Sequence, residues 1–188
     1  LRVLLMAIIP TLLAISVLFQ WIGTRQDLKK YPPPGQMISI AGRNLHLNCS
    51  GSGETTYVLE SGIYYGSIVW DRMQAVLSDN ARVCMYDRAG YFWSEAAVGD
   101  RSPDVLAADL HAVLQAAQVP APYMFVTEGT GALTVYQFAQ QYPGEVQSAV
   151  FIMPLSMNSL AIREADLRYL RSIMWVSRIR AVLGYSHH

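Results

Sequence analysis

The sequence predicts an α/β domain with a mostly parallel sheet of about six strands, preceded by one apolar helix. Three observations carry this prediction. Strand and helix patterns alternate from residue 56 to residue 154, residues 37–49 have the pattern of an antiparallel hairpin, and no charged residue occurs between Val3 and Thr24. With 188 residues, the chain is long enough for one domain with a sizeable core.

The apolar residues 1–24 have the length of a transmembrane helix, because about 20 apolar residues cross a bilayer. Trp21 lies where an aromatic side chain would meet the membrane interface. The alternative is a cleaved signal peptide, but no small-residue cleavage pattern follows the apolar run. We therefore predict a retained single span, on which the small or hydroxylated Ala7, Thr11 and Ala14 would permit close contact with a partner helix.

Residues 25–36 are predicted to form a proline-rich spacer, since three consecutive prolines favour a stiff extended conformation. The α/β domain follows at 37–154. We expect strands at 37–40, 45–49, 56–60, 82–86, 123–127 and 149–153, and helices at 68–77, 102–117 and 131–141. The expected inward face of the first helix carries Trp70, Met73 and Leu77.

The last segment, 155–188, is predicted to be helical and to contact a partner. It combines apolar residues with five arginines, which could meet acidic side chains or anionic lipid headgroups. These arginines are Arg163, Arg168, Arg171, Arg178 and Arg180.

Three motifs resemble those of α/β-hydrolases that carry an N-terminal membrane segment. They are Tyr31-Pro32-Pro33-Pro34-Gly35, Leu45-His46-Leu47-Asn48-Cys49-Ser50-Gly51 and Tyr86-Asp87-Arg88-Ala89-Gly90-Tyr91-Phe92-Trp93-Ser94. The resemblance implies a partial α/β-hydrolase fold, in which residues 155–188 look like the beginning of a lid. Asp87 and Arg88 are interpreted as a satisfied turn pair rather than as catalytic residues.

The resemblance also locates the turn where this family carries its nucleophilic serine, in the pattern G-x-S-x-G between a strand and a helix. Here the turn is degenerate and reads Thr127-Glu128-Gly129-Thr130-Gly131, so Gly129 occupies the serine position. Glu128 or Thr130 could replace the nucleophile, but no histidine is placed to activate Thr130. The acid and histidine that the family carries on late strands have no counterpart before His188. We therefore predict that the chain is not an enzyme.

The loop at residues 60–66 corresponds to the one that supplies a backbone donor to the oxyanion in this family. Tyr64 and Tyr65 stand where small residues are usual, and we expect both rings to fill the site.

The resemblance places Cys49 and Cys84 on neighbouring strands, within reach of a disulfide; the alternative is two free buried cysteines. A disulfide would put the globular domain outside the cytoplasm, in a periplasmic type of compartment. The basic residues Arg25, Lys29 and Lys30 favour the opposite orientation.

The formal net charge is zero, and no clustered basic excess indicates a nucleic-acid partner. No Cys/His spacing indicates a metal, and no glycine-rich motif indicates a cofactor. The predicted function is that of a non-catalytic, membrane-anchored accessory subunit held by other membrane-protein subunits, as occurs by analogy in photosynthetic and respiratory complexes. The alternative is an esterase-like hydrolase whose catalytic C-terminal part is absent from this chain.

Overall fold

The computed structural model describes residues 2–154; residue 1 and residues 155–188 lie outside the described part. The chain divides into two compact units, which are described separately. The first unit contributes α1 (Arg2–Lys30), which contains Pro10. Among the described residues, no helix combines the length and apolar character needed to cross a membrane. The span predicted for residues 1–24 therefore stays a prediction.

Most of the residues predicted to contact partners lie outside the described part of the chain. Thr11 and Ala14 are exposed on α1. The side chain of Ala7 and the whole of the predicted lid-like segment lie outside the described part, and with them the five arginines Arg163, Arg168, Arg171, Arg178 and Arg180.

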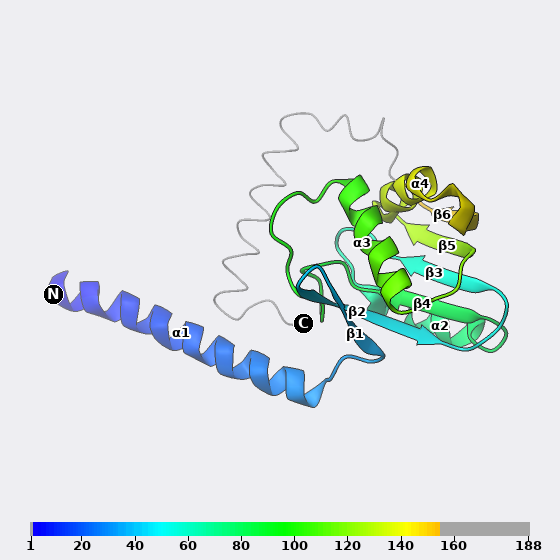
Figure 1. Ribbon diagram of the computed structural model, residues 1–188. Helices are drawn as coiled ribbons and strands as arrows, with labels where there is room; N and C mark the ends of the chain where they lie inside the picture. Colours follow the sequence, from blue (N-terminus) through cyan, green and yellow to red (C-terminus); the bar gives the residue numbers. More distant parts are fainter. Residues whose placement is uncertain (1, 155–188) are drawn as a thin grey trace. The chain divides into compact units, whose positions relative to one another are not determined.

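The second unit begins at Pro33 and is built on a sheet with the strand order β1-β2-β4-β3-β5-β6 (Figure 1). Its strands are β1 (Gln36–Ile40), β2 (Arg43–Ser50), β3 (Thr56–Glu60), β4 (Arg82–Tyr86), β5 (Tyr123–Glu128) and β6 (Val146–Ile152). β1 and β2 form an antiparallel hairpin, β2 is antiparallel to β4, and the remaining neighbours are parallel. The predicted fold class is confirmed.

Neighbouring residues of the central strands point to opposite faces of the sheet, and each face has its own core. Val58, Cys84 and Phe125 belong to the larger core, which also contains the buried faces of the helices α3 (Pro103–Ala116) and α4 (Gly131–Gln141). The next residue along each strand belongs to the smaller core on the other face: Leu59, Met85 and Val126. This alternation is what two helical layers around one sheet require.

Helices cover both faces, with α3 and α4 in front of the sheet in Figure 1 and α2 (Asp71–Leu77) behind it. The predicted helix at 68–77 is in fact two pieces, a 3₁₀ turn η1 (Ser67–Trp70) followed by α2. Its predicted inward face is confirmed, because Trp70, Met73 and Leu77 pack into the smaller core. A short 3₁₀ turn, η2 (Pro143–Glu145), connects α4 to β6.

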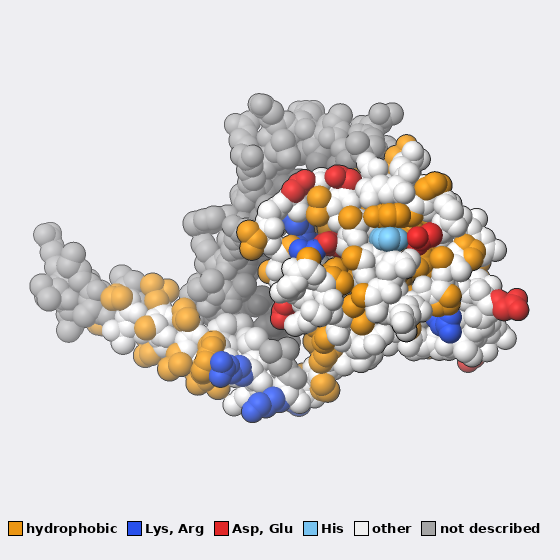
Figure 2. Space-filling model, viewed as in Figure 1, with side chains coloured by type: hydrophobic (Ala, Val, Ile, Leu, Met, Phe, Trp, Pro, Cys, Tyr) orange, Lys and Arg blue, Asp and Glu red, His pale blue; other side chains and the backbone are white. Residues whose placement is uncertain are grey.

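The surface over α3 and α4 mixes apolar and polar side chains. Figure 2 shows the apolar groups of this face scattered among polar ones rather than gathered into a single patch. The side chains that carry chemistry lie elsewhere, where the parallel strands β3, β4 and β5 end. Carboxyl ends of parallel strands meet at one edge of a sheet, so the loops after Glu60, Tyr86 and Glu128 come together there.

Candidate active site

The turn between β5 and α4 has the backbone of a nucleophile elbow. Gly129 adopts a φ of 54°, in the left-handed region that favours glycine. Its N–H donates to the carbonyl of Ile152 at 3.1 Å, which fixes the turn to the end of β6. A side chain at position 129 would have room, since the nearest atom to its Cβ would be Gly62 Cα at 4.0 Å. The turn therefore keeps its bend, while its glycine has no group that attacks a carbonyl.

Gly131 is required for a different reason. A Cβ at this position would lie 2.9 Å from the carbonyl oxygens of both Glu60 and Ser61. The first turn of α4 therefore packs directly against the end of β3 and the loop that follows it.

The Glu128 carboxylate bridges the elbow and the loop after β3. Its Oε1 accepts a hydrogen bond from the backbone N–H of Gly62 at 3.0 Å. Glu128 also lines a cavity of about 310 Å³ whose other walls are Tyr65, Val69, Trp70 and Ile152. The site thus places one carboxylate and one backbone donor beside a largely apolar cavity.

The two threonines of the elbow cannot serve as activated nucleophiles in this arrangement. The hydroxyls of Thr127 and Thr130 are buried, and neither has a hydrogen-bond partner among the described residues. An unactivated hydroxyl is a weak nucleophile, because it needs a neighbouring base to take its proton. Of the predicted candidates in the turn, Glu128 alone is among the residues that line the cavity.

The two tyrosines of the loop behave differently from the prediction. Tyr65 lines the cavity but is 52% exposed, so its ring forms a wall of the cavity without filling it. Tyr64 is 71% exposed and is not among the lining residues, so it does not fill the site. The mouth of the cavity is accordingly less crowded than predicted.

A buried ion pair lies behind this loop, and the sequence analysis missed it. Arg88 Nε donates to Glu60 Oε1 at 2.7 Å, and its Nη2 donates to the carbonyl of Ser61. The carboxylate of Glu60 is fully buried. Burial raises the pKa of Glu60, and Arg88 opposes that rise, as do the hydroxyls of Tyr86 and Thr134.

Tyr86 belongs to the same cluster, and its pKa is raised well above its ordinary value by burial and by the neighbouring Glu60. Burial alone would lower the pKa of Arg88, but Glu60 together with the phenols of Tyr86 and Tyr91 outweighs it, so the pKa is raised. The guanidinium therefore stays charged. The signal available in the sequence was a glutamate at the end of an otherwise uncharged strand, followed one strand later by Asp87-Arg88.

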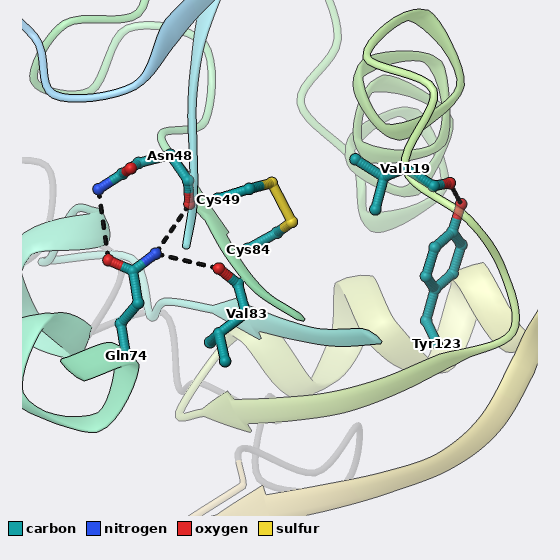
Figure 3. The surroundings of a disulfide bond; sticks show 7 residues. All are labelled: Asn48, Cys49, Gln74, Val83, Cys84, Val119 and Tyr123. Atoms are coloured by element: carbon teal, nitrogen blue, oxygen red, sulfur yellow. Dashed lines mark hydrogen bonds between the residues drawn. A yellow bond between two sulfur atoms is a disulfide. The ribbon is translucent and has the colours of Figure 1, made fainter. Parts of the chain in front are cut away.

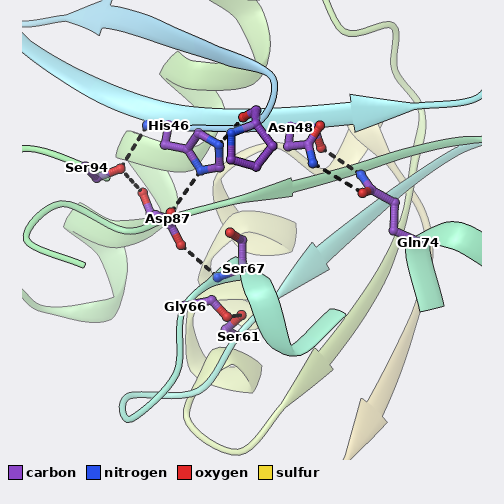
Figure 4. Close-up of polar contacts among 9 residues, drawn as sticks. His46, Asn48, Ser61, Gly66, Ser67, Gln74, Asp87 and Ser94 are labelled. Carbon is purple, nitrogen blue, oxygen red and sulfur yellow. Dashed lines mark hydrogen bonds and ion pairs between the residues drawn. The ribbon is translucent and has the colours of Figure 1, made fainter. Parts of the chain in front are cut away.

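The side chains of Asp87 and Arg88 both have hydrogen-bond partners, as interpreted, but the two residues bind different partners and not each other. Asp87 Oδ1 accepts the N–H of Ser67 at 2.7 Å, and Asp87 Oδ2 lies 2.9 Å from His46 Nδ1 (Figure 4). The other ring nitrogen of His46 contacts the carbonyl of Pro34. His46 is completely buried with both nitrogens engaged, so this His–Asp pair holds the fold together and is not a catalytic dyad.

Cys49 and Cys84 are joined by a disulfide between the directly opposed residues of β2 and β4 (Figure 3). Beside it, the side chain of Gln74 donates to the carbonyls of Asn48 and Val83 at 3.0 and 3.1 Å, which ties α2 to the same pair of strands. The described part of the chain holds no cluster of three or more residues that could ligate a metal ion.

Comparison with known protein families shows which family the chain belongs to. Residues 56–179 match the family model of the α/β hydrolase fold. The chain belongs to the α/β-hydrolase family. The match covers most of the domain, including β3, the turn after β4 and the elbow, so the resemblance inferred from the motifs is confirmed.

This α/β-hydrolase is similar to an uncharacterised protein, YbdG, of Bacillus subtilis, with 22% identity over 77% of this chain and 46% of that protein. Among solved structures it is similar to Cfl2 from Burkholderia cenocepacia, with 25% identity, a TM-score of 0.60, and coverage of 63% of this chain and 40% of the other. A thermophilic esterase from Thermogutta terrifontis matches with 18% identity, a TM-score of 0.59 and coverage of 64% and 45%. The chain spans less than half the length of these proteins.

The prediction that this α/β-hydrolase is not an enzyme is wrong. The structures that share its fold include the esterase, an enol-lactonase from Burkholderia xenovorans and a Vigna radiata epoxide hydrolase, so this fold is one on which enzymes are built. The glycine at position 129 does not by itself establish the absence of catalysis. A missing serine hydroxyl removes one possible nucleophile, but it removes neither the cavity nor the backbone donor of Gly62, and it leaves the Glu128 carboxylate in place.

Proposed function

We propose that this chain forms part of an esterase-type hydrolase, in which Glu128 acts as the general base that activates a water molecule for attack on an acyl ester. The observation that carries the proposal is the carboxylate of Glu128 beside the cavity, held by the N–H of Gly62 at 3.0 Å. A carboxylate fixed by a backbone donor has a defined direction, which a general base requires.

The cavity supports a small, largely apolar ester as the substrate. Its walls are the aromatic side chains of Tyr65 and Trp70 and the aliphatic side chains of Val69 and Ile152, and Glu128 supplies the one ionisable carboxylate among them. Apolar walls bind an acyl or alcohol group by removing it from water, while a few polar groups set its orientation. The volume of about 310 Å³ is at the small end of the range for ligand sites.

In the proposed reaction, one proton passes from water to Glu128 and then to the departing alcohol. Glu128 takes a proton from water as the water oxygen bonds to the ester carbonyl carbon, and the carbonyl oxygen becomes negative. That charge is stabilised by the positive end of the helix dipole of α4, which begins at Gly131. The intermediate then expels the alcohol, which receives the proton from Glu128.

Glycine at position 129 is compatible with this route. A side chain at position 129 would extend toward Gly62, whose Cα would lie 4.0 Å from its Cβ. Glycine leaves that space unfilled, and the proposal places the attacking water there. The left-handed φ of 54° also favours glycine there.

The test is ester hydrolysis by the purified chain with p-nitrophenyl acetate, followed by absorbance. Glu128→Gln keeps the size of the side chain and removes the base, so the rate above the buffer blank should fall by about 10²- to 10⁴-fold. The matched control is Glu54→Gln, the same change in an exposed turn, which should leave the rate unaltered. A wild-type rate equal to the blank, or equal rates for wild type and Glu128→Gln, would show the proposal to be wrong.

Location and partners are a separate proposal. The Cys49–Cys84 disulfide supports an oxidising, extracytoplasmic compartment for the domain. The apolar composition of residues 1–24 supports attachment to a membrane, where other membrane-protein subunits would be the partners. Protease accessibility in sealed vesicles of each orientation tests the location, and co-purification after mild detergent extraction tests the partners. Digestion of the domain only from the cytoplasmic side would contradict the proposed location.

A further inference from the structure

We propose that the buried pair Glu60–Arg88 is a positioning device for the loop 61–66, and that it sets the place of the Gly62 N–H beside Glu128. This inference rests on the proposed function for its catalytic consequence, but the positioning itself can be measured separately. Arg88 and Glu60 are positioning residues, because neither lines the cavity.

The contacts show how the pair acts on the loop. Arg88 holds Glu60 through two nitrogens, at 2.7 Å from Nε and 2.6 Å from Nη2 to the same oxygen, and Nη2 also donates to the carbonyl of Ser61. The peptide bond that begins with this carbonyl ends at the nitrogen of Gly62. Fixing the carbonyl oxygen of Ser61 therefore fixes the direction of the N–H that Glu128 accepts, since the peptide unit is planar.

A second contact from the same turn holds the other side of the loop. The hydroxyl of Tyr91 donates to the carbonyl of Ile63 at 2.6 Å. Arg88 and Tyr91 lie three residues apart in the turn after β4. They bind the carbonyls of Ser61 and Ile63, the residues on either side of Gly62. Gly62 is thus clamped between two carbonyls that one neighbouring turn holds in place.

A further bond anchors the end of the loop. Ser61 Oγ donates to the carbonyl of Gly66 at 3.0 Å, which closes the loop on itself. The next residue, Ser67, donates its N–H to Asp87, the residue before Arg88 (Figure 4). The turn after β4 therefore reaches the loop at its beginning, its middle and its end.

A purely structural explanation of the pair is weaker. Replacing a buried ion pair with apolar residues is often neutral or stabilising, so stability alone is a poor reason to bury one. Here the guanidinium of Arg88 also donates to a backbone carbonyl, that of Ser61, in addition to the carboxylate of Glu60. This carbonyl lies next to the site. Such a bond gives position, which a hydrophobic pair cannot provide.

The test uses the full chain with Arg88→Lys, which keeps the positive charge but cannot reach the carboxylate and the carbonyl in the same fork. The matched control is Arg82→Lys at the opposite end of β4. We expect Arg88→Lys to lower kcat for p-nitrophenyl acetate by about 10- to 100-fold, because displaced catalytic geometry costs rate. We expect KM to stay within about twofold, because the cavity wall is untouched.

A second readout does not depend on activity. The amide resonance of Gly62 in a ¹⁵N–¹H spectrum should shift, and its hydrogen exchange should become faster, in Arg88→Lys but not in Arg82→Lys. If wild type has no activity, the proposed function fails, and the Gly62 amide alone decides the positioning. An unchanged Gly62 amide in a folded Arg88→Lys protein would overturn the inference.

Tyr91→Phe keeps the inference falsifiable if Arg88→Lys does not fold. It removes only a hydroxyl from a half-buried side chain, so the domain should stay folded. We expect the exchange of the Gly62 and Tyr64 amides to accelerate and kcat to fall by a smaller factor than in Arg88→Lys. Wild-type exchange and wild-type kcat in Tyr91→Phe would contradict a clamp on this loop.

Discussion

Reduction of the Cys49–Cys84 bond should cost the domain roughly 4 kcal/mol of unfolding free energy. The two cysteines are separated by 35 positions in sequence. Closing a loop of that size removes about 13 cal/mol/K from the entropy of the unfolded chain, which is about 3.8 kcal/mol at room temperature. The loop contains β3 and α2, so the bond restrains the unfolded arrangement of the elements that lead to the site.

Urea unfolding followed by circular dichroism measures this loss, with three samples separating the contributions. Oxidised and reduced wild type differ only in the bond. The variant Cys49→Ala/Cys84→Ala differs from reduced wild type in packing, because Cys84 is completely buried and Cys49 packs against the same core. We expect reduction to lower the unfolding free energy by about 4 kcal/mol and the double variant to lower it further, by about 1 kcal/mol for each deleted sulfur that is well packed.

The reasoning is refuted if oxidised and reduced protein unfold at the same urea concentration with the same slope. It is refuted more directly if the denatured, non-reduced chain reacts with a thiol reagent at both cysteines. That second result would also remove the support that the disulfide lends to an extracytoplasmic location.

Two further predictions follow from the buried polar groups. Burial and the nearby Glu145 raise the pKa of Tyr123 to about 12, so ultraviolet titration of wild type minus Tyr123→Phe should show one phenol ionising near pH 12 rather than 10. The folded state keeps that proton longer than the unfolded state, so Tyr123 should lower stability as pH rises from 10 toward 12. For Glu60, the raised pKa means that its contribution to stability is fully present below pH 4.5 and is lost as pH rises through the folded value. The unfolding free energy of Arg88→Met/Glu60→Gln should therefore change less with pH than that of wild type, and equal slopes for the two proteins would contradict this. Arg88→Met alone should be less stable than wild type by about 3 kcal/mol, because it leaves Glu60 buried without a partner.

Much of the fold followed from local patterns. Trp70, Met73 and Leu77, which helical spacing predicted to face inward, pack into the smaller core. The two-residue turn at Ala41 and Gly42, both with positive φ, joins the predicted hairpin. Element ends were less accurate, because periodicity does not show where η1 gives way to α2 or that β6 begins at Val146.

The site was predicted only in part, because its essential contacts join residues far apart in sequence. The elbow turn could be located from its strand, glycines and helix. The pairing of Glu128 with Gly62 joins positions 66 residues apart, and that of Arg88 with Glu60 joins positions 28 apart. Periodicity describes which face of an element is buried, but it does not show which strand ends become neighbours. That information came from the sheet order, in which β3 lies between β4 and β5.

Substitution at Gly129 separates the two ways in which a hydrolase of this fold could act. Both Gly129→Ser and Gly129→Ala place a side chain at a φ of 54°, so both should lose about 1 kcal/mol of stability, or about 2–4 °C in Tm. Both also fill the space facing Gly62, which the proposed water attack needs. If water is the nucleophile, the two variants should therefore lose ester hydrolysis to a similar degree, and a further change of Glu128→Gln should add little. If the elbow instead serves a side-chain nucleophile, Gly129→Ser should gain activity that Gly129→Ala lacks. The comparison with alanine removes backbone strain as an explanation, so a gain confined to serine would contradict the role assigned to Glu128.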